Sequence, residues 1–200
     1  DQFFCYLSGD FGQEAGHAFL RNIPHGRFLM AGTDGWNSAV QAVLSADDKL
    51  IPIKRYMYSS DSLSIAHLDK LASNNPNTPH IRRFDVASAS ADNPFLSLGA
   101  FESVEDFIGR GIGFYMQKDD KVVGVAYSSL VCSNAIEISI IVEPDYYRQG
   151  IATALSCQLL KWCIEHHLAP HWDAANEESC QLAEKLGYQP QGEYMAYFYK

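Results

Sequence analysis

The stretch IEISIIVEPDYYRQGIATAL, residues 136–155, changes from an apolar strand pattern, through a proline and a glycine turn, to a helical pattern. The start of a helix carries unpaired N–H groups and a partial positive charge, and phosphate oxygens suit both. Gly150 would let the backbone approach such a ligand closely, and Ala152 keeps the first helical turn slim. Arg148 and Gln149 can add side-chain contacts. The stretch therefore predicts a strand–turn–helix unit that binds a diphosphate.

The segments around this unit alternate between helix and strand patterns. Ser103, with Asp106 three residues later, is typical of a short-helix start. The stretch 113–130 predicts a β-hairpin, and a long helix is expected from Gly150 to about His167. A short extended piece follows, then a helix opened by Asn176, and a last strand, EYMAYFYK. This mixture predicts an α/β or α+β fold with a mixed sheet.

The N-terminal part shows a weaker pattern. It predicts a strand at 28–31, a helix through Ser45 capped by Asn37 or Ser38, and a helix at 61–73 capped by Asp61. The stretch ASNNPNTPH, residues 72–80, is rich in Asn and Pro and interrupts every periodic pattern. We therefore expect a division into an N-terminal α/β part, 1–75, and a C-terminal part, 76–200.

Composition narrows the function classes. Of the 200 residues 47% are hydrophobic and 20% charged, which is typical of a soluble globular protein, and no apolar run is long enough for a membrane span. The net charge of −9 argues against nucleic acid as the main partner and is compatible with a cationic or amine-bearing small molecule. No signal peptide is visible. The five cysteines have irregular spacing, so thiols in a reducing cytoplasm are expected.

A cluster of histidines near the end of the long helix could be mistaken for a metal site. His166 and His167 are adjacent and would point in different directions on a helix, although His171 and Asp173 follow closely. We therefore predict no metal site.

The wider pattern resembles the GCN5-related N-acetyltransferase (GNAT) superfamily. Val142 and Pro144 end the apolar strand, and Gly150 and Ala152 stand at the offsets of that family's turn motif. An Asn that opens a helix ending in Leu-Gly-Tyr, here Asn176 onward, matches a second family feature. Within the superfamily, the chain looks most like the subgroup that includes the zwittermicin A resistance acetyltransferase, which also carries an N-terminal extension.

This resemblance implies a GNAT fold, with a mixed, mostly antiparallel sheet flanked by helices, and transfer of an acetyl group from acetyl-CoA to a primary amine. The strand before the turn would splay from its neighbour and hold the pantetheine, the turn would hold the pyrophosphate, and the second helix would contact the far side of the cofactor. The implied cofactor-binding residues are Ile140, Ile141, Val142, Tyr147, Arg148, Gln149, Gly150, Ile151, Ala152, Thr153, Asn176 and Ser179.

Two departures from the family pattern concern binding and catalysis. Tyr147 occupies the first position of the turn motif, where the family usually has Gln or Arg. Ala183 stands where many members have a tyrosine that protonates the leaving thiolate, so Tyr188 or a water is expected to substitute. Glu137 is the candidate general base, and Asp173 is a second candidate for catalysis or substrate binding. Their structural alternatives are a solvated strand carboxylate and a cap or turn residue.

The acceptor remains open at this level. The leading hypothesis is an enzyme that acetylates the amine of a small molecule, such as an antibiotic or metabolite. The alternatives are a protein or peptide N-acetyltransferase and a non-catalytic acyl-CoA-binding module. The aromatic last strand could pair sheet edges in a homodimer, or it could be a terminal sheet strand within one chain.

Overall fold

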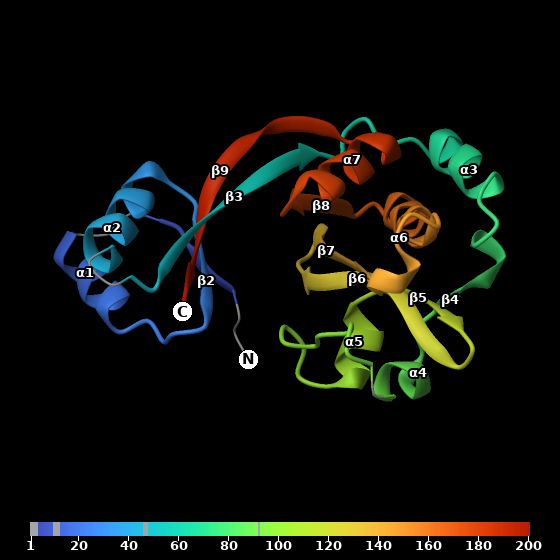
Figure 1. Cartoon of the computed structure of the whole chain (residues 1–200), viewed down its shortest axis with the longest axis horizontal. Coiled ribbons are helices and arrows are strands. Elements are labelled where there is room, and N and C mark those ends of the chain that lie inside the picture. The colour runs from blue at the N-terminus through green and yellow to red at the C-terminus, as the bar shows by residue number, and fades with distance from the viewer. Residues whose placement is uncertain (1–3, 10–12, 46–47, 92) are drawn as a thin grey trace. The chain divides into compact units, whose positions relative to one another are not determined.

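A computed structural model describes residues 4–9, 13–45, 48–91 and 93–200, which form two compact units (Figure 1). The first unit combines residues 1–56 with 192–200, and the second comprises Met57–Gln191. These units do not coincide with the division expected at 75/76. The Asn- and Pro-rich stretch lies inside the second unit, where it connects a helix to a short strand.

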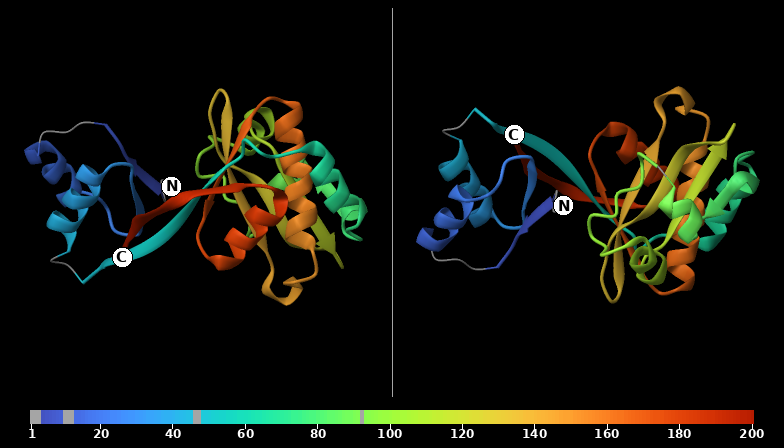
Figure 2. Two further views of the ribbon diagram at one scale, coloured as in Figure 1. Left: turned by 90° about the horizontal axis from the view of Figure 1, so that it is seen from above. Right: turned by 90° about the horizontal axis from the view of Figure 1, so that it is seen from below.

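The first unit is a small sheet covered by two helices. Its strands have the order β1-β2-β9-β3, with β1 parallel to β2 and β9 antiparallel to β2. Helices α1 and α2 lie side by side, and their apolar residues share one core with the strands (Figure 2). The element bounds are β1 Phe4–Leu7, α1 Gln13–Arg21, β2 Arg27–Ala31, α2 Asp34–Leu44, β3 Leu50–Ser59 and β9 Gln189–Tyr199.

The last strand, β9, lies between β2 and β3 in the strand order. It is therefore an interior strand of the chain's own sheet. Of the two alternatives for EYMAYFYK, the terminal strand within one chain is correct, and pairing of sheet edges through β9 in a homodimer is wrong because both its edges are occupied.

Two predicted helix starts were wrong. The N-cap of α2 is Thr33, whose hydroxyl accepts a hydrogen bond from the Trp36 N–H at 3.2 Å, so the helix begins earlier than caps at Asn37 or Ser38 would allow. Helix α3, Ile65–Ser73, begins after Ser64 rather than after Asp61. Several residues with short polar side chains precede each helix, and sequence alone does not choose among them.

The second unit is a mixed sheet with helices on both faces. Its strand order is β3-β8-β7-β6-β5-β4. The pairs β4–β5, β5–β6 and β6–β7 are antiparallel, and β8 is parallel to β7. The expected α/β fold with a mixed sheet is confirmed. The further bounds are the 3-10 turn η1 Thr78–His80, β4 Ile81–Arg83, α4 Val86–Ser90, α5 Val104–Arg110, β5 Gly113–Lys118, β6 Lys121–Val131, β7 Ala135–Val142, η2 Pro144–Tyr146, α6 Ile151–Glu165, β8 Ala169–Ala174 and α7 Glu177–Leu186.

The two faces of β7 meet different neighbours. Ile136 belongs to the core formed with α6, and Ile138, Ile140 and Val142 pack against the same core. Because side chains alternate along a strand, the residues between them point to the opposite face. On that face the neighbouring strand β6 contributes Val125 and Tyr127 to a second core with Phe107 of α5.

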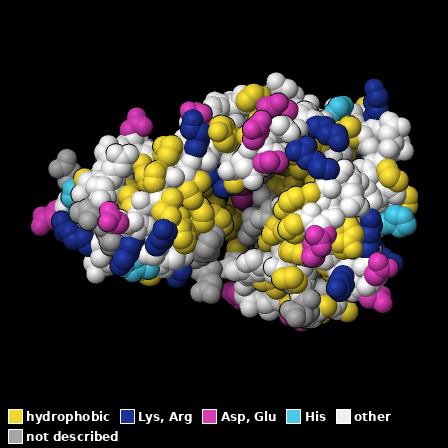
Figure 3. All heavy atoms as spheres, in the orientation of Figure 1, with side chains coloured by type: hydrophobic (Ala, Val, Ile, Leu, Met, Phe, Trp, Pro, Cys, Tyr) yellow, Lys and Arg dark blue, Asp and Glu magenta, His cyan; other side chains and the backbone are white. Residues whose placement is uncertain are grey.

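In the part of the chain that the structure describes, no helix is long and apolar enough to cross a lipid bilayer. Figure 3 shows acidic and basic side chains interspersed on the face in view.

Candidate active site

The predicted strand is β7, and the predicted turn and helix follow its C-terminal end. The strand ends at Val142, η2 follows, and α6 begins at Ile151. Gly150 is the helix N-cap, with φ of +81°, a conformation that glycine adopts with little strain. It provides no side-chain cap, so the first N–H groups of α6 remain available to an anion.

The side chains of the turn itself take up different roles. The Tyr147 side chain is 60% exposed. Arg148 has φ of +62°, in the left-handed region, and its side chain is exposed. The Gln149 amide donates to the Asp145 carbonyl at 3.3 Å and accepts from Lys118 Nζ at 3.3 Å. Gln149 thus braces the turn and brings a lysine beside it.

Two asparagines of the Asn- and Pro-rich stretch at 72–80 contact this turn. Asn75 Nδ2 donates to the Gly150 carbonyl at 2.8 Å, and Asn77 Nδ2 donates to the Gln149 carbonyl at 2.7 Å. The pattern ASNNPNTPH shows that several side-chain amides are available, but it does not show that they reach a turn more than seventy residues away. Sequence reasoning missed both residues for that reason.

A cavity of about 440 Å³ lies beside the turn. Lys185 Nζ, at the end of α7, donates to the Thr153 hydroxyl at 3.1 Å, so one of the lining lysines is held against the first turn of α6. Uncapped N–H groups, a glycine N-cap and nearby lysines fit a polyphosphate group. The lining residues are His67, Lys70, Leu71, Asn74, Asn75, Pro76, Gln149, Gly150, Thr153 and Lys185.

The strand β7 separates from β8 before it reaches the turn. Their paired residues run from Ala135 with Ala169 to Glu137 with His171. From Ile138 onward, β7 pairs with β6 alone among the described strands. The edge of β7 at Ile140, Ile141 and Val142 can therefore offer backbone groups to an extended ligand, as the predicted splay requires.

Glu137 lies where this separation begins. Its strand neighbours are Leu130 on β6 and His171 on β8, and its side chain is half-buried. A β-bulge interrupts β6 between Ser128 and Leu130, and the Ser129 hydroxyl donates to the Glu137 carbonyl at 3.2 Å. Strand alternation turns the Glu137 carboxylate away from α6. It therefore stands where β7 and β8 begin to separate, and its role as general base stays a prediction.

Tyr188, the predicted substitute acid, is buried and hydrogen-bonded. Its side chain is 1% exposed, and its hydroxyl donates to the Pro170 carbonyl at 3.0 Å. Burial raises the pKa of Tyr188 well above its ordinary value, and the nearby Cys163 and Glu137 raise it further. This geometry favours a structural role for the hydroxyl, and the acid role for Tyr188 stays an untested prediction.

The start of α7 is organised by its own hydrogen bonds. The Asn176 side chain accepts from the Ser179 N–H at 2.9 Å, which confirms the predicted helix cap. The Ser179 hydroxyl accepts from Trp172 Nε1 at 3.1 Å. Contact of Asn176 and Ser179 with the cofactor stays a prediction. Asp173 is half-buried near the end of β8, three residues before this cap.

Within the described ranges, no group of three His, Cys, Asp or Glu side chains is arranged to hold a metal ion. Of the histidines near the end of α6, the His166 ring bonds to the Trp162 carbonyl at 2.8 Å.

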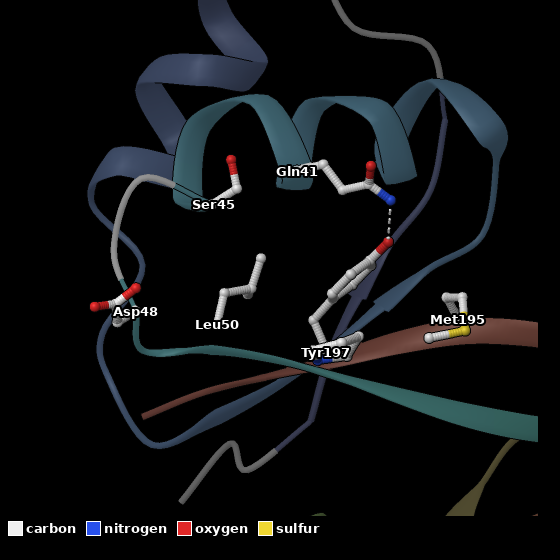
Figure 4. Close-up of a pocket in the computed structure, with 7 residues that line it drawn as sticks. Gln41, Ser45, Asp48, Leu50, Met195 and Tyr197 are labelled. Atoms are coloured by element: carbon white, nitrogen blue, oxygen red, sulfur yellow. Dashed lines mark hydrogen bonds between the residues drawn. The ribbon is translucent and has the colours of Figure 1, made fainter.

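A second cavity, of about 480 Å³, lies in the first unit (Figure 4). Gln41 of α2 donates to the Tyr197 hydroxyl of β9 at 2.8 Å across it, and Ser45 and Asp48 also line it. None of the predicted site residues contributes to this cavity, because all of them belong to the second unit.

Comparison with known proteins extends over almost the whole chain. The sequence is 26% identical to an uncharacterized N-acetyltransferase, YdfB, of Bacillus subtilis over 205 aligned positions, which covers 96% of this chain and 76% of that protein. It is also 30% identical over 82 residues to the [ribosomal protein bS18]-alanine N-acetyltransferase of Escherichia coli, covering 40% of this chain and 55% of that protein.

Among solved structures, a GCN5-related N-acetyltransferase-like protein from Streptococcus suis superposes with a TM-score of 0.84 at 27% identity. The match covers the whole of this chain and 80% of that one. The profile of the GNAT acetyltransferase family matches residues 2–197. The chain therefore belongs to the GNAT acetyltransferase family.

Proposed function

We propose that the protein transfers an acetyl group from acetyl-CoA to the primary amine of a small molecule, such as an antibiotic or metabolite, in the cytoplasm. The observation that carries the cofactor assignment is the turn at Gly150, with its uncapped helix N-terminus next to the open edge of β7. The resemblance to the zwittermicin A resistance subgroup supports an amine-bearing small molecule. Cys157 and Cys163 are buried free thiols, which fit a reducing compartment.

Each part of the site has a task in this proposal. The N–H groups of Gly150 and Ile151 would bind the pyrophosphate, and the edge of β7 would hold the pantetheine in an extended conformation. When bound, acetyl-CoA supplies an activated acetyl thioester. Glu137 would accept the proton of the acceptor ammonium, directly or through water, because only a neutral amine is a nucleophile.

Ala183 stands where many family members have the tyrosine that protonates the leaving thiolate. Ala183 in α7 is completely buried and carries no proton donor. A thiolate is a good leaving group near neutral pH, so this absence slows the reaction without stopping it.

The test of the cofactor assignment is isothermal titration of acetyl-CoA into the native protein and into Gly150→Asp. Aspartate at this position is strained at φ of +81° and places a negative charge next to the expected pyrophosphate. Gly109→Asp is the matched control, because a side chain there meets no atom within 4 Å. Binding of acetyl-CoA by the native protein and by Gly109→Asp, but not by Gly150→Asp, supports the proposal. No binding by the native protein would end it.

A protein N-terminus is the second candidate acceptor. The 30% identity to an enzyme named for acetylating the alanine of a ribosomal protein favours it. A panel of small amines and of alanine-initiated peptides, followed by release of free CoA, separates the two acceptors. Turnover with peptides alone would replace the small-molecule proposal.

A further inference from the structure

We infer that Asn75 and Asn77 are positioning residues that orient the phosphate-binding N–H groups of the Gly150 turn. This inference rests on the proposed function, because it assigns these residues a task in binding the pyrophosphate of acetyl-CoA. It concerns a segment, between α3 and β4, that contains none of the predicted site residues.

The two side chains act on consecutive peptide groups. Asn77 Nδ2 donates to the Gln149 carbonyl, whose peptide group carries the N–H of Gly150. Asn75 Nδ2 donates to the Gly150 carbonyl, whose peptide group carries the N–H of Ile151. In a planar trans peptide the C=O and N–H point in opposite directions. Fixing the Gln149 carbonyl toward Asn77 therefore turns the Gly150 N–H away from Asn77. The Gly150 carbonyl also accepts from the Ala154 N–H at 3.0 Å, so Asn75 adds a second restraint to a peptide group that the helix already holds.

The asparagines are themselves held in place. The Asn75 side-chain oxygen accepts from the Asn77 N–H at 3.0 Å and from Asn77 Nδ2 at 3.2 Å. Asn77 is only 7% exposed, so its amide is oriented in a largely water-free place. The Thr78 hydroxyl donates to the Ala72 carbonyl at 2.8 Å and ties the segment to the end of α3.

Helix α3 carries this segment to the turn. The Lys161 ammonium of α6 forms an ion pair with Asp69 of α3, which fixes the two helices against each other. Asn75 also fills the space next to Gly150, since a Cβ added there would come within 3.2 Å of Asn75 Nδ2. The N-cap glycine and Asn75 thus fit each other, and the turn depends on an element outside the strand–turn–helix unit.

The test compares Asn75→Ala and Asn77→Ala with Asn22→Ala as the matched control. Asn22 follows α1 in the first unit, and its side chain donates to the Ala18 carbonyl at 2.7 Å and not to the turn. Titration with CoA should show roughly five- to tenfold weaker binding for each of the first two variants and no change for the control. Pantetheine lacks the pyrophosphate, so its binding should be the same in all three variants.

A spectroscopic readout separates positioning from a general structural effect. In ¹⁵N–¹H spectra of the native protein, CoA should shift the Gly150 and Ile151 amide signals, and the shift should shrink in Asn75→Ala. Should Asn77→Ala fail to fold, Asn75→Ala still decides. The inference is wrong if the folded Asn75→Ala variant binds CoA like the native protein, or if it loses CoA and pantetheine binding equally. Either result leaves the proposed function unaffected. Absence of CoA binding by the native protein overturns it together with the proposed function.

Discussion

Glu137 is the residue on which the chemical step is expected to depend. Replacing it with Gln keeps the size of the side chain but removes the proton acceptor. We expect kcat to fall about 100- to 1000-fold near neutral pH, with unchanged affinity for acetyl-CoA. The deficit should become smaller at alkaline pH, where the acceptor amine is already neutral.

The measurement is a pH profile of kcat with the acceptor found in the amine panel. Glu178→Gln, at an exposed position in the first turn of α7, serves as the control and should match the native enzyme. An unchanged kcat in Glu137→Gln would leave Asp173 as the remaining candidate base.

The buried cysteines should be chemically inert in the folded protein. Burial raises the pKa of the Cys157 thiol to about 11 and that of Cys163 to about 12, so very little of the reactive thiolate forms at pH 8. With a disulfide reagent such as DTNB, the exposed Cys132 should react first, and the two buried thiols only after unfolding. Loss of the rapid phase in Cys132→Ser checks the assignment.

Among single residues, the sequence predicts those whose contacts are with close neighbours in the chain. The glycine turn and the Asn176 cap depend on a few neighbouring positions, and both are present in the structure. Asn75 and Asn77 work through contacts with residues far along the chain, and no local pattern reveals such a contact.

Among the elements, α5 shows how a short helix is stabilised at both ends. The Ser103 hydroxyl accepts from the Asp106 N–H at 3.2 Å, and Asp106 forms a two-bonded ion pair with Arg110 one turn later. The Arg110 guanidinium, together with the Glu102 N–H, lowers the pKa of Asp106 to about 2. A carboxyl whose folded-state pKa lies below its unfolded value stabilises the protein at higher pH.

This contribution should be complete above about pH 4 and should be lost as the pH falls toward 2. We expect Asp106→Asn to lower the melting temperature at pH 7, with the difference from the native protein shrinking between pH 4 and pH 2. Circular dichroism melts at several pH values measure this. The pair is exposed to solvent, so high salt should reduce the difference at pH 7 as well. A difference that is independent of pH would contradict the charge argument.

The helices and strands of the second unit were the most predictable elements. The strand at 135–142, the hairpin and the cap at Ser103 follow from alternation, turn residues and capping residues. The N-terminal helices were less predictable, because Thr33 and Asn37 are both acceptable caps and only the three-dimensional contacts select Thr33.

On the scale of the whole molecule, the two units have separate hydrophobic cores. Tyr197 is 3% exposed within the core of the first unit, and its hydroxyl accepts from Gln41. We expect Tyr197→Ala to lower the free energy of unfolding of this unit by about 3–5 kcal/mol. Phe19→Ala, at a ring that is 53% exposed, should cost less.

Urea unfolding followed by fluorescence and by acetyl-CoA binding tests whether the two cores are independent. We expect the first unit of Tyr197→Ala to unfold at lower urea, while the second still binds acetyl-CoA. Saturating acetyl-CoA should stabilise only the unit that binds it, by about 2.7 kcal/mol at 100 times its Kd. Loss of acetyl-CoA binding together with the first unit would show that the cores are coupled.

The division of the chain could not be predicted from its sequence. Composition breaks at residues 72–80, but the packing boundary falls within β3 and again within β9. The boundary in β3 falls between Tyr56 and Met57, inside a strand pattern, and Pro190 and Gly192 at the boundary in β9 do not interrupt that strand. Local composition therefore indicates the wrong place.

The placement of β9 also affects how the protein is made. A ribosome synthesises β1, β2 and β3 first, then the whole second unit, and only afterwards the strand that completes the first sheet. At about 5–20 residues per second, synthesis of the intervening segment takes roughly 7 to 27 s. During that time the nascent first unit exposes strand edges and apolar side chains. We therefore expect chaperones to bind the nascent N-terminal segment until β9 leaves the ribosome.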